Sequence, residues 1–303
     1  MSLITPNVIA KEALMQLENT LVMGNLVHRD YKKEFVKVGA TVSIRKPVQF
    51  VASDGAARVN QSVSESTTSV TINKQKHVSW AFSSQDLTLT VDNYAERYIQ
   101  PAMVALANQV DFDLCGLYID IANGVGSPTI APSTFATTAS LVGRRMDEQA
   151  VPQNGRKLVL NPAARWAVLG GVQGTTTGPW STKIAENAFE RAKVANICGF
   201  EVFGDQNIQL HTRGSHTTTT TYVNGTGQTG SSIVCVSTDG LTFLKGDIVT
   251  MVGCYDVNPK SKATLSNLKQ FVITASQTAA SSAITLPIYP PIITSGAYQN
   301  CSA

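Results

Sequence analysis

The stretch DNYAERYIQPAMVALANQVDFDLCGLYIDIAN, residues 92–123, decides the fold because it reads as one long helix. Its apolar residues recur every three or four positions, which places them on one stripe of a 3.6-residue helix. They are Tyr94, Tyr98, Ala102, Leu106, Val110, Leu114, Leu117 and Ile121. Asn93 and Glu96 have capping-box spacing, Gly124 stops the pattern, and Pro101 predicts a kink or a short first helix. The plainer alternative is an ordinary long core helix, and either one would span about 45 Å.

The composition around this helix favours a β-rich protein that assembles. The chain has 303 residues, which suggests about two domains. It is 43% hydrophobic and 15% charged, against roughly a quarter charged in average globular proteins. Serine and threonine fill the difference, and such chains bury polar surface against neighbours. A net charge of +3 is too small for a dedicated nucleic-acid binder.

Five cysteines stand at positions 115, 198, 235, 254 and 301, and none forms a C-x-x-C pair. The odd count and the spacing predict neither a disulfide framework nor a zinc site, so a reducing compartment is the simpler expectation. The first 24 residues show no secretory signal pattern, and no run of about eighteen apolar residues predicts a membrane span.

Residues 40–83 predict a long two-stranded ribbon. Apolar and polar residues alternate over 42–50 and again over 70–82, as in strands with one apolar face. The connection over 52–68 is small and polar. An isolated ribbon is marginally stable in water, so it needs a surface to lie on. The alternative is a hairpin within an ordinary sheet. Residues 1–39 predict an arm that packs on its own domain or on a neighbouring subunit.

The second half of the chain predicts an α/β unit followed by an all-β domain. Residues 133–149 predict a helix, 157–160 a strand, 161–169 a helix capped by asparagine and ended by two glycines, and 199–203 a strand. A mobile loop at 174–178 and a short helix over 181–192 are also predicted. From about residue 211, short strands between frequent turns predict a small barrel. They are 233–236, 248–251, 271–274 and 284–286.

The sequence offers little catalytic chemistry. His211 and His216 lie close in sequence but have no carboxylate partner at ligand spacing. Asp111 and Asp113 fall on different faces of the predicted helix and cannot act as a pair. Cys115 is expected in the core. We therefore predict no catalytic, cofactor-binding or metal-binding residues, and no enzyme activity.

The order of these parts resembles the major capsid proteins of tailed bacteriophages, which share the HK97-like fold. VDNYAERYIQPAMVALANQVDFDLCGLYIDIANG is similar to their spine helix, KLVLNPAARWAVL to the strand–helix step of their axial domain, and NICGFEVFGDQNI to its next strand. The segments LKGDIVTMVG, VNP and QFVIT resemble the inserted β domain of the subfamily typified by the Salmonella phage P-twenty-two coat protein.

The resemblance implies an α+β fold in six parts. These are an N-terminal arm over 1–39, an extended β-hairpin (the E-loop) over 40–83, a peripheral domain with the spine helix over 84–128, an axial domain over 129–211, an inserted β-barrel-like domain over 212–295, and the start of a return segment over 296–303. The family pattern leads us to expect the chain to leave the β domain at that last segment, where the printed sequence ends.

The function implied by the resemblance is self-assembly into an icosahedral head shell that encloses double-stranded DNA. Expected partners are other copies of the chain in pentamers and hexamers, scaffolding and portal proteins, and DNA through weak contacts, with assembly in the bacterial cytoplasm and a final place in the virion. Charged ribbon residues are the intersubunit contact candidates: Arg45, Lys46, Asp54, Arg58, Lys74 and Lys76. The alternative is that these residues only form a solvated face of the ribbon. The alternative function is a tail-associated or adhesin-like binding module built on the β domain.

Overall fold

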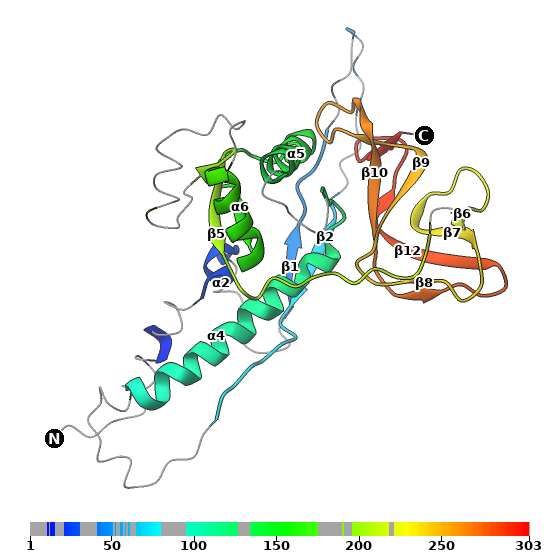
Figure 1. Ribbon diagram of the computed structural model, residues 1–303. Helices are drawn as coiled ribbons and strands as arrows, with labels where there is room; N and C mark the ends of the chain where they lie inside the picture. The colour runs from blue at the N-terminus through cyan, green and yellow to red at the C-terminus, as the bar shows by residue number, and fades with distance from the viewer. Residues whose placement is uncertain are drawn as a thin grey trace. The chain divides into compact units, whose positions relative to one another are not determined.

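The computed structural model divides the chain into two compact units, which are treated separately. It describes residues 21–30, 41–50, 65–79, 95–126, 134–174, 196–217 and 221–302, with isolated positions at 11, 13–15, 52, 55–56, 58, 60 and 190. The first unit comprises Met1–Pro47, Ser64–Gly116 and Gly204–Gln209. The second comprises Val48–Val63, Leu117–Phe203 and Leu210–Ala303. Figure 1 shows the elements with their labels.

The spine helix of the first unit is shorter than predicted. One π-helical turn, Ala95–Ile99, leads into α4, Gln100–Cys115, so Pro101 lies in the first α-turn, where its missing N–H costs nothing. A kink or a short first helix was predicted at the proline, and the structure has a change from π- to α-helical geometry there. The helix ends at Cys115 and continues as a 3₁₀ turn, Gly116–Asp120, instead of running to residue 123. The Gln209 side-chain amide donates to the Phe112 carbonyl at 3.1 Å, and this carbonyl also accepts from the backbone N–H of Gly116.

The ribbon consists of two antiparallel strands that are also shorter than predicted. Strand β1, Thr41–Arg45, pairs with β2, Thr67–Thr71, and the register sets Thr41 opposite Thr71. The alternating pattern over 72–79 does not form the predicted strand, and 80–82 lie outside the described residues. The arm contributes a short helix, α2, Met23–Leu26. The paired part of the ribbon is therefore five residues long in each strand. The segment over 72–79 that follows it is held by the contacts of Lys74 and Lys76 with Asp113.

The α/β part of the second unit follows the predicted order. Its elements are α5, Phe135–Glu148; β3, Lys157–Leu160; α6, Pro162–Gly174; β4, Asn196–Ile197; and β5, Phe200–Gly204. The strands form a sheet in the order β3-β5-β4. The Asn161 side chain accepts a bond from the Ala164 N–H at 2.8 Å, which confirms the predicted cap.

Helix α6 corrects one predicted boundary. It continues through Gly170 and Gly171 to Gly174, because a helical glycine costs only about 1 kcal/mol and does not by itself end a helix. Apolar side chains of α5, β3, α6 and β4 form the core of this part: Phe135, Ala139, Leu160, Val168 and Ile197. The predicted loop beyond residue 174 and most of the helix over 181–192 lie outside the described residues.

The β part of the second unit is a six-stranded antiparallel sheet in the order β13-β9-β10-β12-β7-β6, with a small β11-β8 pair (Figure 1). Its strands are β6, Thr221–Val223; β7, Gly230–Ser237; β8, Thr242–Phe243; β9, Ile248–Val257; β10, Thr264–Ile273; β11, Gln277–Thr278; β12, Ala283–Ile292; and β13, Cys301–Ser302. The four strands predicted here are present, and the paired strands extend further. The core contains Ile233, Phe243, Phe271, Ile273, Leu286 and Ile288.

The end of the chain differs from expectation in two ways. We expected 296–303 to leave the β domain, whereas Cys301 and Ser302 pair with Asp256 and Tyr255 of β9. In addition, a disulfide joins Cys254 to Cys301, which corrects the prediction of unbonded cysteines. The two residues lie 47 positions apart, so only the β9–β13 pairing, and no local spacing, brings them together.

Candidate functional site

Two acidic residues of α4 hold two different segments of the first unit. As their spacing predicts, Asp111 and Asp113 do not pair with each other. Asp111 is 3% exposed, and its carboxylate accepts bonds from the N–H groups of Val22 at 2.8 Å and Gly24 at 2.9 Å. These are N–H groups at the start of α2, so the carboxylate caps that short helix. Hydrogen bonds to a charged group contribute about 1.5–3 kcal/mol each, which attaches the arm firmly to the spine.

Asp113 holds the segment that follows the ribbon. Its carboxylate lies 3.0 Å from the Lys76 ammonium and 3.3 Å from that of Lys74. The hydrogen bond from Lys76, supported by Lys74 and opposed by burial, lowers the pKa of Asp113 below its ordinary value of 3.8. A lowered pKa means that this contact stabilises the fold above pH 3.8 and is lost as the pH falls through the folded-state value. Both lysines were predicted as intersubunit contacts, and both are bound within the chain.

Two further ribbon candidates lie on the paired strands. Arg45 and Glu65 approach to 3.4 Å across the ribbon, with side chains 80% and 55% exposed. Such a pair contributes about 0–1 kcal/mol. The Lys46 N–H donates to the Ser66 carbonyl at 2.8 Å, which extends the pairing by one residue and leaves the lysine side chain exposed. The side chains of Arg45 and Lys46 therefore remain accessible to a partner.

The last two ribbon candidates belong to the connection between the strands. The Arg58 guanidinium donates to the Asn60 side chain at 3.1 Å, and this contact is exposed to solvent. Asp54 lies outside the described residues. Among the candidates described in the first unit, Lys74 and Lys76 share Asp113, whereas Arg45 pairs with Glu65. Their role between subunits stays a prediction.

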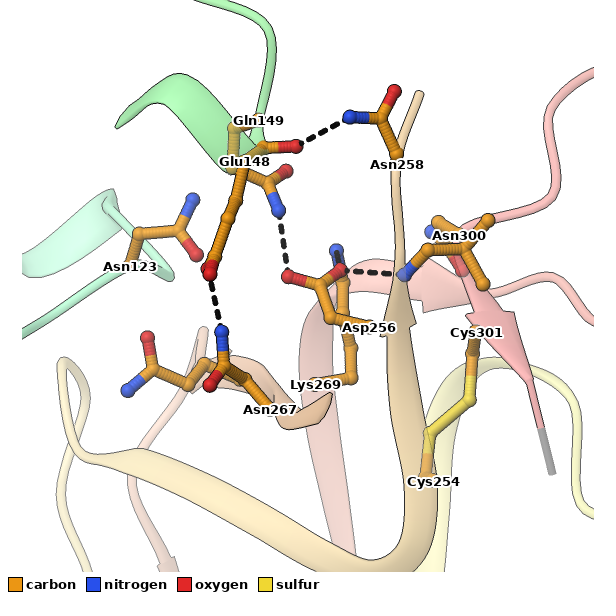
Figure 2. A network of polar contacts seen from close by, with 12 residues as sticks. Asn123, Glu148, Gln149, Cys254, Asp256, Asn258, Asn267, Lys269, Asn300 and Cys301 are labelled. Carbon is orange, nitrogen blue, oxygen red and sulfur yellow. Dashed lines mark hydrogen bonds and ion pairs between the residues drawn. A yellow bond between two sulfur atoms is a disulfide. The ribbon is translucent and has the colours of Figure 1, made fainter. Parts of the chain in front are cut away.

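The second unit contains a buried cluster of charges where α5 meets the six-stranded sheet, which together with the β11-β8 pair is called the barrel below (Figure 2). Asp256 of β9 has no exposed surface, and its carboxylate lies 2.9 Å from both the Lys269 ammonium and the Arg145 guanidinium. It also accepts bonds from the Gln149 side chain at 2.6 Å and from the Val257 N–H at 3.0 Å. Lys269 and Arg145 are 5% and 8% exposed. The two cations and the hydrogen bonds together compensate for burying the carboxylate.

Glu148 extends this cluster at the end of α5. Its side chain accepts bonds from Arg144 at 2.7 Å and from the Asn267 amide, and its carbonyl accepts one from Asn258 at 3.0 Å. Arg145 lies 3.7 Å from the same carboxylate. Figure 2 shows Glu148 and Gln149 pointing from α5 toward the barrel strands. The cluster therefore fixes the orientation of the barrel on the α/β part.

A second buried carboxylate lies at another attachment of the barrel. Asp247 is 1% exposed and accepts backbone bonds from Leu244 at 2.8 Å and Gly214 at 3.2 Å. His211 Nε2 lies 2.8 Å from one carboxylate oxygen, and His216 Nδ1 lies 3.5 Å from the other. No carboxylate lies at ligand spacing from these histidines in the sequence, and the fold supplies Asp247 from a distant position. Asp247 lies 31 residues or more away in sequence, so short-range spacing gives no signal for it.

The 3₁₀ turn after α4 contacts the same cluster. The Tyr118 hydroxyl lies 3.3 Å from His211 Nδ1, and Lys245 forms an ion pair with Asp120 at 2.9 Å. Tyr118, His211 and Asp247 therefore form one chain of hydrogen-bonding side chains. Burial raises the pKa of Tyr118, so its phenol stays protonated and serves as a hydrogen-bond partner. These contacts hold the entry into the barrel in place.

The remaining sequence expectations concern thiols and metals. Cys115, expected in the core, is partly buried beside Asp205, with 3.9 Å between sulfur and carboxylate oxygen. Burial, followed by the charge of Asp205, raises the pKa of this thiol to about 11. Across the described part of the chain, no three His, Cys, Asp or Glu side chains group as metal ligands. In the same residues, no helix is long and apolar enough to cross a membrane.

The polar clusters described above join elements of one chain to each other, which is a structural role. The family model described as P22 coat protein - gene protein 5 matches residues 4–303. The chain therefore belongs to the P22 coat protein family, and it is a major capsid protein with a structural role in a phage head. The resemblance drawn from residues 92–123 and from the strands after residue 211 predicts this class, and the family model confirms it.

Two further comparisons add no functional detail. No curated protein sequence matches the chain. A solved structure from Mycobacterium phage Che8 is similar at 13% sequence identity and a TM-score of 0.49. The similarity covers 88% of this chain and 90% of that one.

Proposed function

We propose that the chain forms an icosahedral shell of HK97-like subunits in which the ribbon of each copy lies on a neighbouring copy. The observation that carries this proposal is the exposure of the ribbon. Every residue of β2 is exposed, including Val70 at 43%, and β1 alternates between exposed and half-buried positions. Two paired strands in which no residue is more than half-buried are marginally stable in water, so a surface outside the described contacts would stabilise them.

The anchoring of the ribbon supports the same proposal. Lys74 and Lys76 attach the outgoing segment to Asp113, and the strands beyond this point stay exposed. A fixed root with an exposed end suits an element that reaches another subunit. The accessible candidates Arg45, Lys46 and Arg58, with Asp54, are proposed to make the intersubunit contacts. Lys74 and Lys76 are assigned to the root.

The finer partner assignments follow from the coat-protein role. Scaffolding and portal proteins are proposed as partners during assembly in the bacterial cytoplasm, and double-stranded DNA as the enclosed cargo in the virion. A net charge of +3 supports only weak, sequence-independent contact with DNA phosphates. The inserted barrel and the axial domain are proposed as the two parts joined by the Asp256 cluster.

The proposal is tested by expressing the chain alone and together with the other head proteins of its phage. Sedimentation and negative-stain microscopy would detect closed shells, tubes or spirals with walls of uniform thickness. We expect such particles in at least one of the two conditions. A subunit that stays monomeric in both conditions would contradict the proposed function.

A charge exchange tests the role of Arg45 separately from that of the ribbon. Arg45→Glu removes both the internal pair with Glu65 and any contact with a neighbour, whereas adding Glu65→Arg restores only the internal pair. We expect the single variant to lower particle yield and the double variant to leave it low. Full recovery in the double variant would show that Arg45 acts only within the ribbon. Arg58→Glu, whose described partner is the neutral Asn60, is expected to lower the yield as well.

A further inference from the structure

The outward side of β6, β7 and β12 carries no charged residue. The strand sequences TYV, GSSIVCVS and AITLPIYPPI contain no Asp, Glu, Lys or Arg. Because 15% of the chain is charged, about three charged residues would be expected in strands of this total length. Solvated strand faces normally carry charges, so their absence indicates a surface that is covered in the working protein.

The strand register gathers exposed apolar and hydroxyl side chains on this side. Tyr222 lies opposite Val236, which in turn lies opposite Ala283, and in the next row Val234 lies opposite Thr285. Tyr222 is 63% exposed and Val234 is 39% exposed. On β7 and β12 the alternate positions belong to the core: Ile233, Cys235, Ile284 and Leu286. We call the outward side of these three strands the neutral face.

The neutral face ends at an unprotected sheet edge. β6 is the last strand in the order, and no other described strand pairs with its outer side. By contrast, the part of β7 that extends past β6 has its edge occupied by a side chain. The Gln228 side chain accepts a bond from the Val234 N–H at 2.7 Å and donates to its carbonyl at 3.0 Å. β6 has no lysine or proline of the kind that blocks edge pairing and is protected only by its length of three residues.

We propose that the neutral face docks on the neutral face of a second copy about a local two-fold axis, with the two β6 strands antiparallel. The inference rests on the proposed function, because assembly of many copies supplies the partner. A two-fold contact sets a surface against itself, so a face with charges of one sign would repel its mate. An uncharged face of tyrosine, valine and threonine is complementary to itself. The short β6 edge adds few hydrogen bonds, so side-chain burial supplies most of the contact.

Symmetry makes the proposal testable with single cysteines. In an antiparallel pair about a two-fold axis, the residue at the axis lies opposite the same residue of the second copy. The residue before it lies opposite the residue after it in that copy. We would make Thr221→Cys, Tyr222→Cys and Val223→Cys one at a time, with the exposed Cys198 replaced by serine. Particles would be oxidised and run on a non-reducing gel. We expect covalent dimers from at least one of the three variants.

Val252 provides the matched control. It is 98% exposed and lies on an irregular stretch of β9. There the residues 251–254 lie opposite the single residue 269 of β10. Val252→Cys therefore places an accessible thiol on the same barrel away from the neutral face. We expect no dimer from it. Equal cross-linking by this control, or particles of the three test variants without dimers, would overturn the inference.

A charge placed on the face gives a second readout. Tyr222→Asp puts two like charges close together across the axis and is expected to lower particle yield by about tenfold or more. Val252→Asp makes a similar change in charge and is expected to leave the yield within about twofold. The opposite ranking would overturn the inference. Failure of the unmodified protein to assemble would instead overturn the proposed function, and the inference with it.

Discussion

Replacing Asp256 by asparagine tests whether the buried cluster holds the barrel on α5. The substitution keeps the shape of the side chain and removes its charge. Lys269 and Arg145, which are 5% and 8% exposed, would then each lose a carboxylate at 2.9 Å. An amide oxygen can still accept one hydrogen bond, but its NH₂ group turns a donor toward the other cation. Two nearly buried cations would remain without an adequate counter-charge.

The magnitude follows from burial. Removing one partner of a buried ion pair costs about 3–5 kcal/mol, because the remaining charge stays desolvated. The bond that the asparagine can retain places the expected loss near the lower limit, about 3 kcal/mol. Native proteins have free energies of unfolding of about 5–15 kcal/mol, so this loss would be a large fraction of the total stability. Replacing the cluster in full, by Asp256→Leu, Lys269→Met and Arg145→Met together, is expected to recover most of the loss because no buried charge is left unpaired.

The assay is urea unfolding of the unassembled subunit, with hydrogen exchange to locate the change in β9, β10 and α5. Asp120→Asn is the matched control. Its ion pair with Lys245 has the same 2.9 Å length, but the side chains are 55% and 42% exposed, so the expected cost is below about 1 kcal/mol. If Asp256→Asn lowers the free energy of unfolding no more than this control does, the cluster does not hold the joint.

Three further predictions address other contacts of the subunit. Asp111→Asn is expected to weaken attachment of the arm by about 1–3 kcal/mol, seen as faster hydrogen exchange in the arm with little change in the barrel. Cys254→Ser together with Cys301→Ser opens a loop of 47 residues and is expected to lower the free energy of unfolding by about 4 kcal/mol under non-reducing conditions only. At pH 8, Cys115 should react with a thiol reagent far more slowly than the exposed Cys198. Its pKa of about 11 leaves roughly a hundredfold less thiolate than the ordinary 9.0 does.

Local signals predicted the elements that depend on neighbouring residues. Asn161 caps α6 where expected because the cap and the N–H group it binds lie three positions apart. Pro101 interrupts the spine pattern through its own ring. The end of α4 could not be predicted in this way. A contact made there, from Gln209 to the Phe112 carbonyl, joins residues 97 positions apart, so no local pattern reports it.

The functional contacts were missed for the same reason. Asp256 and Lys269 are 13 positions apart and meet because β9 and β10 pair, while Arg145 comes from another part of the chain. Asp247 reaches His211 across 36 positions. Charged residues at such separations read as solvated surface, so the sequence analysis assigned them no role. The candidates it did choose were the charges on the ribbon, where alternation made the exposed positions visible.

The placement of charge separates contacts within a subunit from contacts proposed between subunits. The buried carboxylates Asp111, Asp247 and Asp256 each bind groups of their own chain and have almost no exposed surface. A desolvated pair tolerates little error in geometry, so such contacts set orientation more than they add net stability. The neutral face and the ribbon have the opposite character, since both are exposed to solvent, the face without charge and the ribbon with charged side chains such as Arg45. Shell formation needs contacts that are weak enough to correct yet repeated by symmetry, and exposed surface of either kind suits that need. Buried charge therefore fixes the shape of each subunit, and exposed surface is left to join the copies.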